Sequence, residues 1–337
     1  MKHSFKYQGK FLTELGSTII NPEFAYHTYG EFNPEKNNII WICHAYTANS
    51  DAADWWDSMV GEGKFYDPTH YFIVCVNYLG SCYGSTGPMS INPETGIPWY
   101  RSFPDITVRD MVKGLDLIRQ HLGIEKIHTI IGGSIGGFQA LEWSIINPSL
   151  FTHTVLIACS VKTNPWAIAL NESQRMSIAA DPTFEQDIPG GGTNGLKAAR
   201  TIALLSYRNG KAYNLTQAES NEEVVTNFKA SSYQRYQGEK LVKRFDAYTY
   251  FLLTKVLDSH NIARKRAGFA EVLKTIKAKT LVISITSDIL FPPEEQAYMA
   301  SLIPGAILKT IASDFGHDGF LIESELLSKL LSNFYQT

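Results

Sequence analysis

The chain has 337 residues, of which 44% are hydrophobic and 19% are charged, and its formal net charge is −3. This length allows one large domain with an insertion, or two domains, and the composition gives no sign of disorder. Acidic and basic residues are mixed, so we expect no binding to nucleic acid and none to a membrane surface. No apolar run has the length of a membrane span, and the N-terminus has no signal-peptide core.

The four cysteines form no C-x-x-C pair, so we expect neither a zinc site nor a redox-active cysteine pair. No H-E-x-x-H or comparable ligand spacing occurs either. We therefore expect a cytoplasmic protein that holds no metal.

The predicted elements begin with antiparallel strands within residues 4–30. Short apolar runs then predict buried strands at 38–43, 71–77, 127–133, 153–159, 280–286 and, more weakly, 306–311. Helical periodicity predicts helices at 107–122, 135–146, 293–303 and 322–335. This alternation predicts an α/β fold with a mainly parallel central sheet that is covered by helices on both faces.

The alternation stops between about residues 162 and 272. A glycine-rich loop at 189–195 is followed by amphipathic helical segments near 196–207, 216–230 and 238–259. We predict that residues 162–272 form a helical cap, inserted into a core domain made of residues 1–161 and 273–337.

A serine flanked by glycines lies between the predicted strand at 127–133 and the helix that follows. The pentapeptide from Gly132 to Gly136 has the pattern G-x-S-x-G, with Ser134 at its centre. Such a strand–turn–helix presents the hydroxyl above the sheet edge and is typical of the nucleophile elbow of the α/β-hydrolase fold. A dinucleotide-binding turn is the alternative, but G-x-G-x-x-G is not satisfied because Ser134 occupies the place of the second glycine.

A nucleophilic serine needs a base and a group that orients the base, in the chain order serine, acid, histidine. Asp288 follows the strand predicted at 280–286, and His317 lies in the loop after 306–311. Of nine histidines, only His317 lies after the last strand and downstream of an acid at a strand end. We predict a triad of Ser134, Asp288 and His317, with Asp314 as the alternative orienting acid.

Acyl transfer also needs backbone donors that stabilise the oxyanion. In this fold they come from the residue after the nucleophile and from the loop after an early strand. The expected donors are the backbone N–H groups of Ile135 and of Tyr46, which follows the strand at 38–43.

Several longer stretches resemble the homoserine O-acetyltransferase family of α/β-hydrolase-fold acyltransferases. They are WWDSMVG at 55–61, NYLGSCYGSTGP at 77–88, GGSIGGFQALEW at 132–143, LSYR at 205–208 and RFDA at 244–247. The similarity runs from about residue 20 to the end of the chain.

The resemblance implies a ping-pong reaction in which Ser134 takes acetyl from acetyl-CoA, a cosubstrate, and passes it to the γ-hydroxyl of L-homoserine for methionine synthesis. It also implies that Arg208 binds the amino-acid carboxylate, that Asp318 meets the ammonium group and that Thr47 touches the substrate. No permanently bound cofactor is implied, and the family suggests a homodimer.

The sequence departs from the family pattern at the predicted oxyanion loop, where the usual HALTG is HAYTA at residues 44–48. This departure leaves open a succinyl donor or a serine acceptor. An esterase or deacetylase that uses water as the acceptor is the alternative from another class, and a non-enzymatic binding module is a third.

Overall fold

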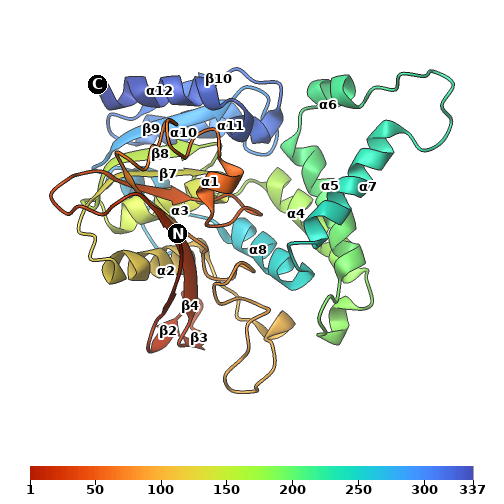
Figure 1. Ribbon diagram of the computed structural model, residues 1–337, viewed down its shortest axis with the longest axis horizontal. Coiled ribbons are helices and arrows are strands. Elements are labelled where there is room, and N and C mark those ends of the chain that lie inside the picture. The colour runs from red at the N-terminus through yellow and green to blue at the C-terminus, as the bar shows by residue number, and fades with distance from the viewer. Residues whose placement is uncertain (337) are drawn as a thin grey trace.

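The computed structural model describes residues 1–336, and its centre is an eight-stranded sheet (Figure 1). All strands from β5 onward run parallel, whereas β1 pairs with β4 and β4 with β6 in antiparallel fashion. The strand order is β1 (Lys2–Lys6), β4 (Glu23–Tyr29), β6 (Phe72–Val76), β5 (Ile39–Cys43), β7 (Ile127–Gly133), β8 (Phe151–Ile157), β9 (Lys279–Ile285) and β10 (Ile307–Ile311). A separate hairpin pairs β2 (Lys10–Leu12) with β3 (Thr18–Ile20).

Helices cover both faces of the sheet, as predicted, because alternate residues of each central strand point to opposite sides. In β5, Trp41 and Cys43 enter one core, whereas Ile40 and Ile42 enter the other. The first core includes residues of α2 (Val108–His121), α3 (Ile135–Ile146) and α10 (Pro293–Leu302). The second includes residues of α1 (Ala52–Trp55) and α12 (Ser324–Gln336). Short helical turns complete the core: η1 (Tyr100–Ser102), η3 (Gly316–Asp318) and α11 (Gly319–Ile322).

Between β8 and β9 the described chain is helical and adds no strand to the sheet. The elements are α4 (Pro165–Ala179), η2 (Phe184–Gln186), α5 (Thr193–Tyr207), α6 (Gly210–Gln217), α7 (Lys229–Val242), α8 (Ala247–Ser259) and α9 (Phe269–Leu273). Helices α4 to α7 project from the sheet, whereas α8 lies beside it (Figure 1) and contributes Leu253 and Val256 to the first core. The predicted cap boundaries at 162 and 272 stay a prediction.

In this segment one helix was missed and two predictions were wrong. Helix α4 was missed, although Asn164 and Pro165 form a helix start in which the Asn164 side chain accepts from the Ala167 N–H at 2.8 Å. The helix predicted at 216–230 is instead the end of α6, a loop and the start of α7. The helix predicted at 238–259 is interrupted because Asp246 caps a new helix, α8, through the Thr249 N–H at 2.7 Å.

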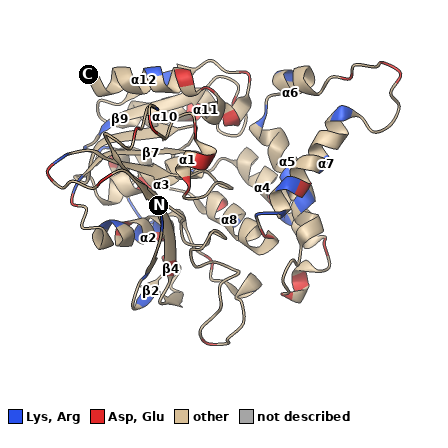
Figure 2. Ribbon diagram, in the orientation of Figure 1, with Lys and Arg blue, Asp and Glu red and all other residues tan. Residues whose placement is uncertain are grey.

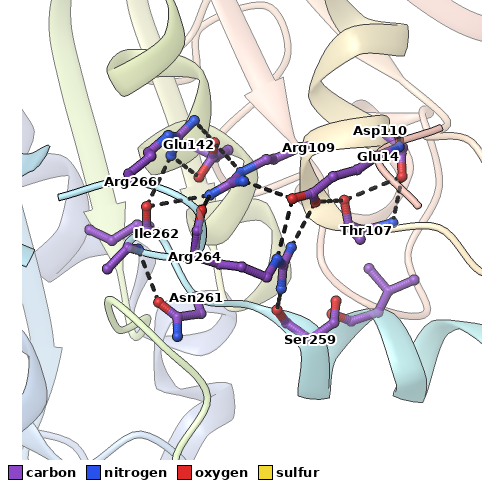
Figure 3. Close-up of polar contacts among 12 residues, drawn as sticks. Glu14, Thr107, Arg109, Asp110, Glu142, Ser259, Asn261, Ile262, Arg264 and Arg266 are labelled. Atoms are coloured by element: carbon purple, nitrogen blue, oxygen red, sulfur yellow. Dashed lines mark hydrogen bonds and ion pairs between the residues drawn. The ribbon is translucent and has the colours of Figure 1, made fainter. Parts of the chain in front are cut away.

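Two carboxylates and three arginines join the N-terminal hairpin to the core (Figure 3). Glu14 pairs with Arg109 and Arg264, both at 2.7 Å, and Glu142 pairs with Arg109 at 3.1 Å and with Arg266. Glu142 is 2% exposed, and buried charges are tolerated only when they are paired in this way. The network therefore ties the β2–β3 connection, α2, α3 and the segment after α8 into one unit.

Candidate active site

Ser134 occupies the sharp turn between β7 and α3. Its backbone has φ 57° and ψ −126°, a left-handed conformation that a non-glycine residue rarely adopts. Its N–H donates to the Ile157 carbonyl at 3.0 Å, and its carbonyl accepts from the Phe138 N–H at 3.1 Å. The structure thus places Ser134 in the strained strand-to-helix turn that the glycine pattern predicted.

Glycine at position 136 brings the end of β5 close to this turn. A Cβ on Gly136 would lie 2.1 Å from the Cys43 carbonyl oxygen and 3.1 Å from that of His44. Strand pairing sets the same proximity, because Cys43 is the partner of Gly132 in the β5–β7 register. The predicted oxyanion loop therefore starts directly beside the serine.

Asp288 and His317 form a buried pair. The Asp288 Oδ2 accepts from the His317 Nδ1 at 2.7 Å, and the Asp288 Oδ1 accepts from the backbone N–H groups of Leu290 and Phe291 at 2.8 and 3.0 Å. This arrangement leaves the His317 Nε2 as the free ring nitrogen. It is buried and has no hydrogen-bond partner among residues 1–336.

Asp314, the alternative orienting acid, lies elsewhere. Its carboxylate pairs with Lys211 at 2.7 Å, and both side chains are more than half exposed. Within the described chain, Asp288 is therefore the carboxylate that contacts the His317 ring.

Burial and charge act in opposite directions on His317. Burial lowers its pKa, but the charge and hydrogen bond of Asp288 and the charge of Asp318 outweigh burial and raise the pKa above the usual 6.5. For Asp318, burial raises the pKa of the carboxyl, and nearby Arg208, His317 and Arg200 oppose that rise. The site thus stabilises an imidazolium, the form that the histidine of a serine triad takes while it holds a proton.

A cavity of about 470 Å³ brings these groups together. It is lined by Ala45, Tyr46, Thr47, Ala48, Asn49, Asp54, Trp55, Ser134, Arg200, Tyr207, Lys240, Arg244, His317, Asp318 and Leu321. No hydrogen bond joins the Ser134 hydroxyl to His317 in the described part of the chain, and such catalytic bonds often tighten only when substrate binds.

The two predicted oxyanion donors are free. Neither the Ile135 N–H nor the Tyr46 N–H donates a hydrogen bond within residues 1–336. The Tyr46 side chain and carbonyl are fixed, because its hydroxyl donates to the Tyr250 carbonyl at 2.7 Å and its carbonyl accepts from the Tyr78 hydroxyl at 2.7 Å. Both amides are thus available to a ligand atom.

Two of the three predicted substrate residues line the cavity, and the third does not. Thr47 and Asp318 line the cavity, and the Thr47 carbonyl accepts from Arg244. Arg208 is not among the described residues that line it, and its Nε lies 3.1 Å from the Asp318 carboxylate in an ion pair without hydrogen-bond alignment.

Sequence reasoning missed Arg200, which does line the cavity. Its guanidinium lies 5.7 Å from the centre of the Tyr207 ring, and its Nε is buried without a partner among the described residues. Its position on α5, two helical turns before Tyr207, could have suggested a shared face. Lys240 near the end of α7 and Arg244, which follows that helix, add further positive charge, and Figure 2 shows basic segments on both α5 and α7.

The described residues contain no group of His, Cys, Asp and Glu side chains that could hold a metal ion. Among residues 1–336 there is also no helix with the length and hydropathy needed to cross a bilayer.

Comparison with known proteins identifies the family to which the chain belongs. Residues 38–324 match the family model described as alpha/beta hydrolase fold. A homoserine O-acetyltransferase of Cyclobacterium marinum is 45% identical over 322 residues, which cover 96% of this chain and 92% of the relative. The crystal structure of homoserine O-acetyltransferase from Bacillus anthracis superposes with a TM-score of 0.92 at 25% identity, covering 99% of this chain and 97% of that one. Esterase E22 shares the fold, with a TM-score of 0.89 at 24% identity and 99% coverage of both chains. The chain therefore belongs to the homoserine O-acetyltransferase family, which has the α/β-hydrolase fold.

Proposed function

We propose that this protein transfers the acetyl group of acetyl-CoA to the γ-hydroxyl of L-homoserine, a step of methionine synthesis, through an acetyl-Ser134 intermediate. The Asp288–His317 pair carries the proposal, because it leaves a buried, unpartnered Nε2 in the cavity that Ser134 lines. The similarity to named homoserine O-acetyltransferases supports the choice of substrates.

In the first half-reaction the Ser134 Oγ attacks the thioester carbonyl and His317 Nε2 takes the hydroxyl proton. The N–H groups of Tyr46 and Ile135 stabilise the resulting oxyanion. The carbon–sulfur bond then breaks, the proton passes from His317 to the sulfur, and CoA leaves as its thiol.

In the second half-reaction the homoserine hydroxyl attacks acetyl-Ser134, and His317 takes the proton of that hydroxyl. A second oxyanion forms at the same backbone donors. When it collapses, O-acetylhomoserine leaves and His317 returns the proton to Ser134.

We further propose that charged cavity residues orient the amino acid. Asp318 and Thr47 both line the cavity, and we assign Asp318 to the ammonium group and Thr47 to contact with the acceptor. The cavity favours Arg200 over Arg208 for the carboxylate, because Arg200 faces the cavity while Arg208 pairs with Asp318. Replacing Arg200 with methionine should therefore raise the KM for homoserine more than the matched Arg208→Met change does.

The cap surface supports the proposal of a homodimer. Large apolar side chains that are each more than half exposed lie on α4, α5, α6 and α7 and on the loop before α7: Trp166, Met176, Leu205, Leu215, Val225 and Tyr236. A dimer formed through the caps would remove these side chains from water, which favours association. Sedimentation equilibrium should show a dimer, and a monomer at all concentrations would contradict this.

The central test follows free thiol from acetyl-CoA with and without L-homoserine, and identifies the product by mass spectrometry. Thiol release that depends on homoserine and yields O-acetylhomoserine is the expected result. Equal release without homoserine would mean that water is the acceptor and that the protein is a hydrolase. Serine and succinyl-CoA serve as comparison substrates, and a Ser134→Ala variant with full activity would overturn the mechanism.

A further inference from the structure

His44 is a buried histidine for which the proposed reaction has no step. It follows the last residue of β5 and is 1% exposed. Its Nδ1 lies 2.9 Å from the carbonyl oxygen of the next residue, Ala45. Since a carbonyl can only accept, the Nδ1 carries the proton.

We propose that His44 is a positioning residue that holds the peptide unit between Ala45 and Tyr46, so that the Tyr46 N–H faces the oxyanion. The inference rests on the proposed acyl transfer at Ser134. It assigns a role to a side chain that is not among the described residues lining the cavity.

Peptide geometry connects the two ends of this unit. This peptide bond is trans, so the Ala45 carbonyl and the Tyr46 N–H lie in the same plane and point in opposite directions. The Ala45 carbonyl accepts from the His44 ring and also from the Ala48 N–H at 3.0 Å. Turning the plane would break both bonds and would point the carbonyl oxygen, instead of the N–H, at a developing negative charge.

The His44 ring is itself fixed. It stacks on Tyr78 with the ring centres 4.4 Å apart, and the Tyr78 hydroxyl donates to the Tyr46 carbonyl at 2.7 Å. One aromatic side chain therefore supports both the His44 ring and the next peptide unit of the loop.

The environment of His44 suits a permanent donor and not a proton shuttle. Its Nε2 is buried and finds no partner among residues 1–336, and no carboxylate contacts the ring. Burial lowers the pKa of His44 to about 4, although the hydrogen bond to Ala45 opposes this, so the ring stays neutral near pH 7. His317, with its carboxylate partner, has the opposite arrangement.

The test compares His44→Phe and His44→Asn with a matched control, His260→Phe. Phenylalanine keeps an aromatic ring on Tyr78 but has no donor, whereas the Asn Nδ2 occupies nearly the place of the His Nδ1. His260 is also buried, stacks on Phe138 at 3.8 Å and contacts a backbone carbonyl, that of Ser160, through Nε2 at 2.9 Å. It lies outside the cavity lining.

The readout is the burst rate of Ser134 acetylation by p-nitrophenyl acetate, measured beside the thermal midpoint of each variant. We expect His44→Phe to slow acetylation about 10²-fold, as the loss of one oxyanion donor does. The His44→Asn variant should be acetylated at least about tenfold faster than His44→Phe. The His260→Phe variant should change the thermal midpoint, and its acetylation rate should stay within about tenfold of wild type.

Two results would overturn the proposal. One is wild-type acetylation by a folded His44→Phe variant, and the other is a folded His44→Asn variant no faster than His44→Phe. If His44→Phe does not fold, His44→Asn decides alone: acetylation within about tenfold of wild type supports the proposal, and a greater loss refutes it. This assay needs no homoserine, so it tests the role of His44 separately from the proposed function. If the wild-type protein reacts with p-nitrophenyl acetate but never acetylates homoserine, the proposed function is refuted and the His44 comparison is still valid.

Discussion

Replacing Asp288 with asparagine should nearly abolish acyl transfer while leaving the fold intact. The Asp288 Oδ1 accepts from the Leu290 and Phe291 N–H groups at 2.8 and 3.0 Å, so the amide oxygen of asparagine must take that place. The amide NH₂ then points at the His317 Nδ1, where the Oδ2 lies at 2.7 Å in the parent protein.

An NH₂ group at this position reverses the hydrogen bond. It donates to Nδ1, so the imidazole proton moves to Nε2, the nitrogen that must accept the proton of Ser134. Trapping the wrong tautomer of a triad histidine costs about 10⁴-fold in kcat, equivalent to about 5.5 kcal/mol of barrier.

The assay is homoserine-dependent thiol release from acetyl-CoA, measured beside the circular dichroism spectrum. Asp314→Asn is the matched control, because Asp314 pairs with exposed Lys211 and should lose less than about twofold. The reasoning would be refuted if folded Asp288→Asn kept more than a tenth of wild-type kcat, or if Asp314→Asn lost as much as Asp288→Asn.

Three further outcomes follow from contacts described above. Gly136→Ala should lower both kcat and the thermal midpoint because its Cβ would lie 2.1 Å from the Cys43 carbonyl oxygen; Gly210→Ala, which meets nothing within 4 Å, should leave both unchanged. Glu142→Gln removes the negative charge from a largely buried ion-pair network, at about 3 kcal/mol. Calorimetry should show a midpoint about 4 °C lower for a chain of this length, and an unchanged midpoint would contradict the ion-pair argument. In the proposed mechanism the neutral form of His317 is the base, and its pKa is raised. The value of kcat/KM should therefore fall as the pH drops through a value above 6.5, and an acidic limb at or below 6.5 would contradict the electrostatics of the pair.

The strands and the outer helices of the core were predictable because burial alone gives them a clear pattern. Strands β5, β6, β7 and β9 are nearly continuous apolar runs, and each lies within one residue of its predicted bounds. Strand β8 begins and ends two residues earlier than predicted, so Cys159 follows the strand instead of ending it. Near the site, Ser134, Asp288 and His317 follow strands, so chain order and the parallel sheet were enough to group them.

The segment between β8 and β9 was harder to predict because α4 to α7 bury only part of their surface, whereas α8 is buried on most sides. A helical period does not show where one such helix stops, and the break before α8 depends on a side-chain cap at Asp246. Arg200 and Arg208 lie on the same stretch of chain, and only the packing of α5 decides which one faces the cavity. The contact from His44 to Ala45 spans one residue and leaves no periodic signal.

The left-handed backbone of Ser134 makes the folded protein about 1–3 kcal/mol less stable than a relaxed turn would. A glycine at this position would relieve the strain and abolish the nucleophile in one step. A substitution at residue 134 that raised thermal stability would therefore remove reactivity. Stabilising substitutions should be sought at surface positions away from the turn between β7 and α3.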